Sequence, residues 1–490
     1  MISASDWVII DTFILLLQIL VAGVMVINIW RHIHDPNVII FKFLFCIFSL
    51  SVAFWIIFPA GVGVWAGELM QTDVVWIRRQ ISVVGGIPIP SLIDALALFI
   101  SVCVLCASTG QHTKKKITWS PLIFIIIFGI IICIGLLSRV DSSPSVYQAA
   151  NETYNKYSIV RHLVTFIVGP IFSFIYLNKF RVEYLIGRER CLFIVLKAVI
   201  IITLLSSISV CALPDVLKND RYGSFSTFGS QSALQLFAIS VGLMFIYGFS
   251  RSGIGPYVIA LSGLALLGLY KVLIYYFGVA AATIFGNKIL GQRLCSSRPI
   301  LIAFLFLLLL VEPLTILLAN QLNLLGESGS LYTRALQAQF ATEALDTPIR
   351  FLFGLGWDVP YAEIQAFGQF DGGAWDSREV ATGWARAVQI VPFSLLRSVG
   401  IVGLTMMTIM AALFVCESIR ANLMNKRRLN WRTNVGLILI FVTYLSVLFS
   451  GTDVLPESVS LVSGLTWLFF MTHVGGSSSS SLGCLQKGNR

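Results

Sequence analysis

Charged residues are scarce in this chain of 490 residues. Asp, Glu, Lys and Arg together make up 12% of it, whereas 57% of the residues are hydrophobic, and the mean hydropathy is +0.86. Such a composition excludes an ordinary soluble domain, whose water-facing surface needs more charge. The net charge of +10 does not indicate a nucleic-acid partner, because excess Lys and Arg in a membrane protein mostly set its orientation.

Residue patterns that bind metals or form disulfides are also missing. The nine cysteines fall mainly in apolar runs and none lies between 319 and 392, so neither a disulfide framework nor a thiolate metal site is supported. No Asp-x-Asp motif occurs, and we expect no divalent metal and no cofactor. The first apolar run, from Trp7, lacks a basic n-region and a cleavage pattern, which favours a retained span over a signal peptide.

Long apolar runs recur along the whole chain. Runs of eighteen or more apolar residues are typical of transmembrane helices, so we predict an all-α, polytopic bundle of about 12–14 spans. Between 254 and 285 two short runs are interrupted by Lys271, and one of them could be a re-entrant segment. The thirteen predicted spans lie near 7–30, 37–58, 89–108, 119–137, 159–178, 191–213, 231–249, 254–269, 271–285, 300–318, 393–415, 433–450 and 455–472.

Basic residues gather in alternate turns between these spans. Because basic loops are retained in the cytoplasm, turns such as Lys114–Lys116 and Lys426–Arg428 predict an N-terminus outside and a C-terminus inside. We expect a multi-pass protein in contact with membrane lipids, whose longest loop faces the exterior, or the periplasm if the membrane is the inner membrane of a Gram-negative bacterium. The predicted divisions are an N-terminal transmembrane bundle at 1–318, a periplasmic catalytic loop at 319–392, C-terminal transmembrane helices at 393–474 and a flexible cytoplasmic tail at 475–490.

The polar segment at 319–392 is the longest stretch outside the predicted spans. Long loops in compact proteins are usually functional or disordered, and the many aromatic residues here favour order. From Ser330 to Leu345, apolar residues at helical spacing predict a helix that carries Arg334 and Gln337 on a neighbouring stripe. Such a helix would suit the bilayer surface, with Arg334 either facing a lipid headgroup or simply solvated. The charged residues of the segment include Arg334, Glu343, Asp346, Arg350, Asp358, Glu363, Asp371, Asp376, Arg378, Glu379 and Arg386.

Two further polar features border the predicted spans. Arg221-Tyr222-Gly223-Ser224-Phe225 precedes the seventh span, where free backbone N–H groups and an adjacent arginine suit a phosphate; a plain surface turn with an arginine anchor is the alternative. Glu312 precedes Pro313 near the outer end of the tenth span. An ionisable group there would line a cleft, pair with an arginine of the site, or form a structural ion pair.

The order and sidedness of these motifs resemble the O-antigen polymerase and O-antigen ligase superfamily. The resemblance covers roughly 215–415 and rests on Arg221-x-Gly-x-Phe, Ser250-Arg251-Ser252, the arginine-bearing outer helix with its Gly-x-Gly, and a helix start at Gly400 to Gly403. It implies a GT-C-like membrane glycosyltransferase acting on undecaprenyl-pyrophosphate-linked oligosaccharides. It also implies that Arg221 and Arg334 lie near the lipid pyrophosphate and that Gly354 and Gly356 form a turn of the loop.

Ligases of the superfamily commonly carry a histidine eleven residues before the glycine that opens the next helix. That position is Gln389 here, and the polar segment contains no histidine, which favours a polymerase. A polymerase would transfer the growing glycan to a lipid-linked repeat unit, and such enzymes commonly bind a chain-length regulator. A ligase that moves the glycan to lipid A-core or another acceptor, and a transporter or flippase of lipid-linked glycans, remain the alternatives.

The chemistry needs cations for the departing pyrophosphate and an acceptor for the proton of the attacking hydroxyl. Arginine fits the first role because it stays charged and donates bidentately to phosphate oxygens. The acidic residues of the segment are candidate bases, among which the sequence does not choose. The expected catalytic residues are Arg221, Arg334, Arg350, Glu343 and Gln389. The expected pyrophosphate- or glycan-binding residues are Gly223, Gly354, Gly356, Arg378, Arg386 and Glu312.

Overall fold

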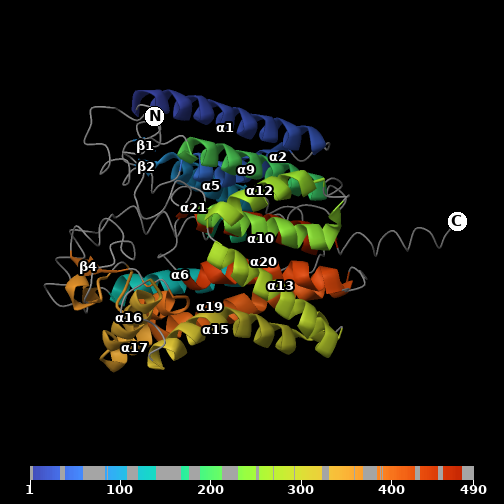
Figure 1. Ribbon diagram of the computed structural model, residues 1–490. Helices are drawn as coiled ribbons and strands as arrows, with labels where there is room; N and C mark the ends of the chain where they lie inside the picture. Colours follow the sequence, from blue (N-terminus) through green and yellow to red (C-terminus); the bar gives the residue numbers. More distant parts are fainter. Residues whose placement is uncertain are drawn as a thin grey trace.

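The structure is a computed structural model in which nearly all described residues are helical (Figure 1). It describes residues 4–33, 39–58, 83–84, 87–107, 120–138, 167–175, 188–211, 230–249, 253–268, 270–291, 293–322, 330–357, 359–367, 383–386, 388, 390–424, 431–450 and 456–476. The prediction of an all-α bundle is confirmed for these residues. The long helices are α1 (Ala4–His32), α2 (Ile39–Ile57), α5 (Ile89–Ala107), α6 (Ser120–Leu137), α9 (Arg188–Cys211), α10 (Ser230–Tyr247), α12 (Gly255–Gly268), α13 (Tyr270–Leu290), α15 (Arg298–Gln321), α19 (Phe393–Met424), α20 (Trp431–Ser450) and α21 (Pro456–Gly476).

Each predicted span coincides with one of these helices, except that near 159–178, of which residues 167–175 are described and helical. By length and composition, four described helices (α1, α9, α19 and α20) can cross a membrane, and bent α15 would be a fifth. Shorter apolar helices lie within α2, α5, α6, α10 and α21. The total of about 12–14 spans stays a prediction.

The remaining elements are short. Two antiparallel pairs of strands are described, with Val84 opposite Ile87 in one and Ala362 opposite Ala385 in the other. The short elements are β1 (Val83–Val84), β2 (Ile87–Pro88), α14 (Arg293–Ser296), α16 (Ser330–Glu343), α17 (Pro348–Phe353), β3 (Ala362–Glu363), the 3-10 helix η6 (Ile364–Phe367) and β4 (Trp384–Ala385).

Helix α20 lies in the core and packs against α10, α13, α19 and α21. It approaches α10 closely because Gly242 and Gly436 face each other, so that a Cβ on Gly242 would lie 2.8 Å from the Gly436 carbonyl oxygen. Small residues at such crossings let helix backbones pack tightly in a membrane. Next to this crossing, the Trp467 indole N–H donates to the Tyr444 hydroxyl at 3.0 Å, which satisfies two buried polar groups at once.

Helix α15 bends where the sequence carries Glu312-Pro313. Its two parts, Arg298–Val311 and Pro313–Gln321, meet at 45°. Proline lacks the backbone N–H that would continue the helical ladder, and its ring clashes with the preceding turn, so a bend at Pro313 is expected. Glu312 therefore lies at the bend, one helical stretch before the polar segment.

Candidate functional site

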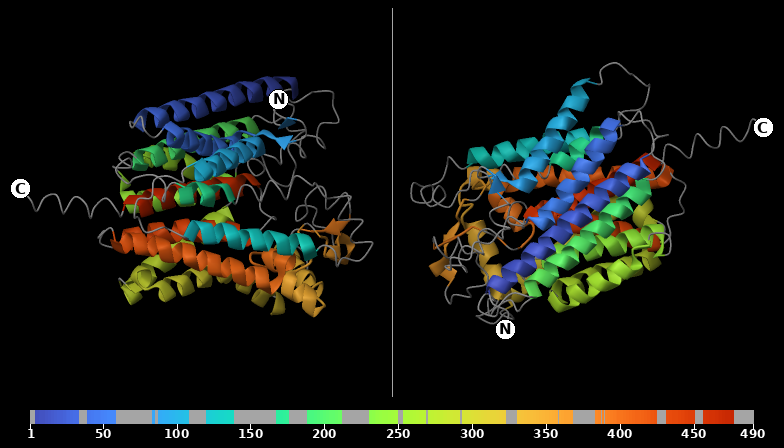
Figure 2. Two further views of the ribbon diagram at one scale, coloured as in Figure 1. Left: turned by 180° about the vertical axis from the view of Figure 1, so that it is seen from behind. Right: turned by 90° about the horizontal axis from the view of Figure 1, so that it is seen from above.

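The polar segment between α15 and α19 folds against one end of the bundle, the end at which α1 begins (Figures 1 and 2). Helices α16 and α17 and the β3–β4 pair are its described parts, so the prediction of a partly helical, ordered loop is confirmed for them. Backbone bonds from Tyr361 to Ala385 (3.0 Å) and from Ile364 to Gly383 (2.8 Å) close the pair. The segment has a small core of its own, formed by Ala341, Leu345, Leu355, Val359, Tyr361, Ile364, Phe367, Ala385 and Val388.

The alanines of helix α16 share one face, as the spacing predicts, and this face packs against the protein. Ala335 and Ala338 are buried against Ile316 of α15 and against Ile390. Gln337, on the neighbouring stripe, is also buried, whereas Arg334 is half-buried. The apolar face of α16 therefore holds the helix to the protein, and this packing fixes the position of the helix that carries Arg334.

Arg397, near the start of α19, joins this segment to the bundle. Its side chain is 1% exposed. One guanidinium nitrogen, Nη1, donates to the carbonyl oxygens of Val359 (3.1 Å) and Arg386, and Nη2 donates to the Ser398 hydroxyl at 2.9 Å. A rigid fork of donors suits this task better than a single ammonium group. Two parts of the polar segment that are separated in the sequence are thus tied to one helix by one side chain.

Replacing Arg397 with methionine is expected to destabilise the protein by about 2–5 kcal/mol, because buried carbonyl groups lose a charged donor. The measurement is the apparent unfolding temperature of the purified full-length chain in detergent. Arg432, which is exposed and lies over the Trp431 ring, provides the matched control, since Arg432→Met should change stability by no more than about 0.5 kcal/mol. Equal unfolding temperatures for the two variants would contradict the role of Arg397.

Two glycines allow the backbones of the polar segment and α19 to touch. Gly354 has a φ of 79° and Gly400 a φ of 65°, values that favour glycine. A Cβ on Gly354 would lie 2.5 Å from the carbonyl carbon of Ser398, and one on Gly400 would fall on the Leu352 carbonyl group. The backbone N–H of Gly356 donates to the Ser398 carbonyl at 3.1 Å. The turn at Gly354 and Gly356 therefore holds the polar segment against α19.

The prediction that a helix begins at Gly400 is right only for the longer part of α19. A first helical stretch already starts at Phe393, and the helix is interrupted at Gly400, where φ is 65° and ψ is −170°. Residues in this region of backbone space cannot continue a helix. Next to this interruption, the backbone carbonyl groups of Arg397 and Ser398 accept hydrogen bonds from the N–H groups of Leu355 (2.7 Å) and Gly356.

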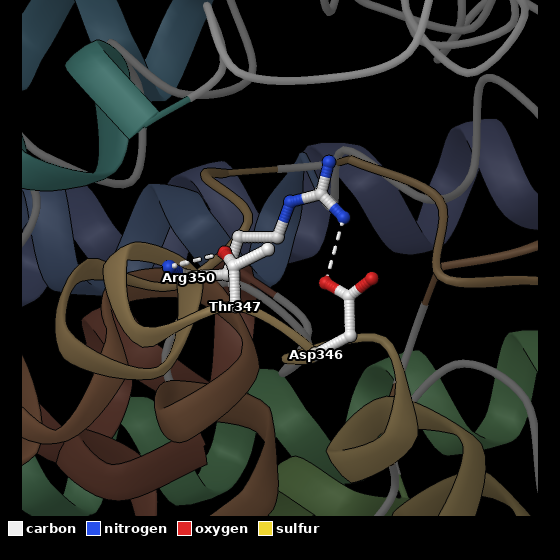
Figure 3. A network of polar contacts seen from close by, with 3 residues as sticks. All are labelled: Asp346, Thr347 and Arg350. Carbon is white, nitrogen blue, oxygen red and sulfur yellow. Dashed lines mark hydrogen bonds and ion pairs between the residues drawn. The ribbon is translucent and has the colours of Figure 1, made fainter.

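Arg350 has a carboxylate partner (Figure 3). Its Nη1 atom lies 2.9 Å from Asp346 Oδ1, and its backbone N–H donates to Thr347 Oγ1 at 3.2 Å. Thr347 is the N-cap of α17 and Pro348 follows it, which is a favourable helix start. Any phosphate bound by Arg350 would have to compete with Asp346.

The other predicted residues are only partly brought together. Arg386 is buried and its carbonyl oxygen receives Arg397, so it belongs to the docking region with Gly354 and Gly356. Glu343 is exposed on α16 and accepts a hydrogen bond from Gln339 at 2.9 Å. In the part of the chain that the structure describes, no three His, Cys, Asp or Glu residues are placed to hold a metal ion. Arg221, Gly223, Arg378 and Gln389 lie outside the described residues.

A second buried polar cluster, between α2 and α5, was not identified from the sequence. Asp94 is 2% exposed; its Oδ2 accepts the Trp55 indole N–H at 2.8 Å and its Oδ1 accepts the Ser51 hydroxyl. A carboxylate within an apolar run was the available signal, because such groups are costly in a membrane and pair within the bundle. The same signal was available for Arg397.

These features define a helical membrane protein with a folded polar segment at one end of its bundle. No protein-family model, no curated protein and no solved structure matches the chain.

Proposed function

We propose that this protein is an O-antigen-type polysaccharide polymerase. It transfers a growing glycan from undecaprenyl pyrophosphate to a lipid-linked repeat unit at the outer leaflet of a bacterial inner membrane. The observation that carries the proposal is the attachment of the arginine-bearing polar segment to α19 through Arg397 and the Gly354–Gly400 contact. Its cationic side chains are thereby held at the end of the bundle, where the phosphates of a lipid-linked substrate would lie.

The reaction forms a bond between a sugar hydroxyl of the repeat unit and the anomeric carbon of the donor glycan. The bond from that carbon to the pyrophosphate breaks, the hydroxyl proton goes to a base, and undecaprenyl pyrophosphate leaves. Fixed positive charge lowers the barrier because negative charge grows on the leaving group, and alignment of the two substrates lowers it further. In this proposal Arg334, with Arg221, holds the pyrophosphate, while Arg350 is held by Asp346 until substrate enters.

Two features support a polymerase over the other classes. The polar segment contains no histidine, so the base expected of a ligase is missing from it. Transporters tend to place charged residues and broken helices at the middle of the bilayer, whereas this chain carries its longest polar stretch outside the predicted spans, between α15 and α19. A GT-C-like arrangement, with Glu312 at the bend of α15 near the substrate cleft, forms part of the same proposal.

Deletion of the gene in its native host tests the reaction class. We expect the deletion strain to produce lipid A-core that carries a single repeat unit, which is seen as one band above bare core on gel electrophoresis of its lipopolysaccharide. Long chains should return when the wild-type gene is supplied. Bare core alone would identify a ligase instead, and an unchanged surface glycan would contradict both. A chain-length regulator, if it binds, would affect the length distribution rather than the presence of long chains.

A further inference from the structure

Helix α17 exposes four large apolar side chains, one at position 349 and three at positions 351–353. Ile349 is 63% exposed, Phe351 47%, Leu352 41% and Phe353 40%, and none of the six residues of the helix is buried. Neighbouring α16, by contrast, buries its apolar face against the protein. A cluster of this kind on a polar segment marks an interaction surface.

The backbone, rather than the side chains, holds α17 in place. The Ser138 hydroxyl donates to the Phe353 carbonyl oxygen at 2.9 Å, and the following turn is bonded to α19 through Leu355 and Gly356. At its other end Thr347 caps the helix. The apolar side chains are therefore presented outward by a firmly attached element, and their exposure does not follow from a loose end of the chain.

The surroundings of α17 indicate what covers these side chains. The other large apolar residues exposed in the described structure lie on, or directly beside, the long apolar helices, where a surrounding bilayer would cover them. On the last turns of α15, Leu314, Leu318 and Leu322 are 56–59% exposed. This end of α15 packs against α16, and α17 lies beside both (Figures 1 and 2). The exposed apolar residues of α17 thus belong to an element that lies beside the exposed apolar end of α15.

We propose that α17 is immersed in the leaflet on which the polar segment rests, with Ile349, Phe351, Leu352 and Phe353 in contact with phospholipid acyl chains. Short apolar elements flanked by charged groups lie in this interfacial region, with the charges at headgroup level. Arg350 and Asp346, at the start of α17, would then stand at the depth of the lipid phosphates. The contact between α17 and the acyl chains would fix the distance between the polar segment and the bilayer. This inference does not depend on the glycosyltransferase activity.

Site-specific photocrosslinking in liposomes tests the proposal. A benzophenone amino acid replaces Phe351 or Phe353 in the full-length chain, which is reconstituted into phosphatidylethanolamine–phosphatidylglycerol liposomes, and adducts are identified by mass. Leu307, 58% exposed on α15, serves as the lipid-facing reference, and Gln339, exposed on the polar helix α16, as the matched control. Ile349 provides a third position should one phenylalanine variant fold poorly.

We expect phospholipid adducts at Phe351 and Phe353 at roughly the yield found at Leu307 and at least about fivefold above Gln339, because side chains immersed in the leaflet meet acyl chains and water-facing side chains do not. Lipid yields no higher than at Gln339 would overturn the proposal. Crosslinked dimers of the chain in place of lipid adducts would also overturn it, since they would show that a second copy covers this surface.

Discussion

Replacing Arg334 with alanine is expected to slow glycan chain growth by about 10²–10³-fold, enough to remove long chains from the surface polysaccharide. Loss of one donor to a developing negative charge costs about 3–4 kcal/mol of transition-state stabilisation, which corresponds to that change in rate. Arg334 is half-buried on α16, and the burial of Ala335 and Ala338 fixes the helix that carries it. We therefore expect the Arg334→Ala variant to lose activity and to keep its fold. Gel electrophoresis of lipopolysaccharide from a complemented deletion strain measures the result, and Arg221→Ala should behave in the same way.

Two further variants show whether the loss is specific to the site. Arg334→Lys keeps the charge but loses the bidentate geometry, so an intermediate chain length is expected. Arg432 is exposed at the start of α20, outside the polar segment, and Arg432→Ala should leave the length distribution unchanged. All variants must be present in the membrane at wild-type amounts. Long chains in both Arg334→Ala and Arg221→Ala would place the pyrophosphate site elsewhere.

Gly400→Ala is expected to detach the polar segment from α19 and to abolish chain growth. The φ of 65° and ψ of −170° at this position belong to a region populated almost only by glycine, so the backbone strain alone costs about 1–3 kcal/mol. The added Cβ would also fall on the Leu352 carbonyl group, which is backbone and cannot rotate away. We expect the segment to be cleaved at least about tenfold faster by a protease added from its side of reconstituted vesicles, because local opening controls cleavage.

Gly263→Ala is the matched control for this variant. Gly263 lies in α12, and a Cβ there would meet nothing within 4 Å. Alanine is favoured over glycine in a helix by about 0.5–1 kcal/mol, so protease resistance and chain growth should both be retained. If Gly400→Ala resembled Gly263→Ala in both assays, the close contact between α19 and the Leu352–Gly354 backbone would not be what attaches the segment.

The sequence predicted the helices of the bundle and the helix in its polar segment. Within a bilayer the backbone can satisfy its polar groups only inside a helix or a closed barrel. A long apolar run such as that of α19 or α20 is therefore predicted to be a helix from its sequence alone. The spacing of Ala335, Ala338 and Ala341 likewise predicted α16 and the face that these residues share, but not that this face packs against the protein. Local patterns suffice where each residue's environment depends on neighbours three or four positions away.

The candidate site was less accessible to this reasoning. Arg350 and Glu343 looked equivalent to the other charges of the segment, yet one is paired with Asp346 and the other is exposed beside Gln339. Arg386 contributes its backbone carbonyl, and not its charge, to the bond with Arg397. Spacing along a loop does not reveal which side chains meet, because the loop's path is set by contacts with distant helices.

Composition and periodicity by themselves determined that this protein is helical, lies in a membrane and carries one long polar segment between two apolar runs. Only the tertiary structure decided that Arg397 and Gly400 attach that segment to α19. It also decided that the Trp55 indole N–H donates to the Asp94 carboxylate. Likewise, only the structure shows that α17 rather than α16 exposes its apolar side chains. The physical reason is the range of the interactions. Helix formation in an apolar run is decided by adjacent turns, whereas these hydrogen bonds and close contacts join elements that are separate in the chain, and no local pattern identifies the partner.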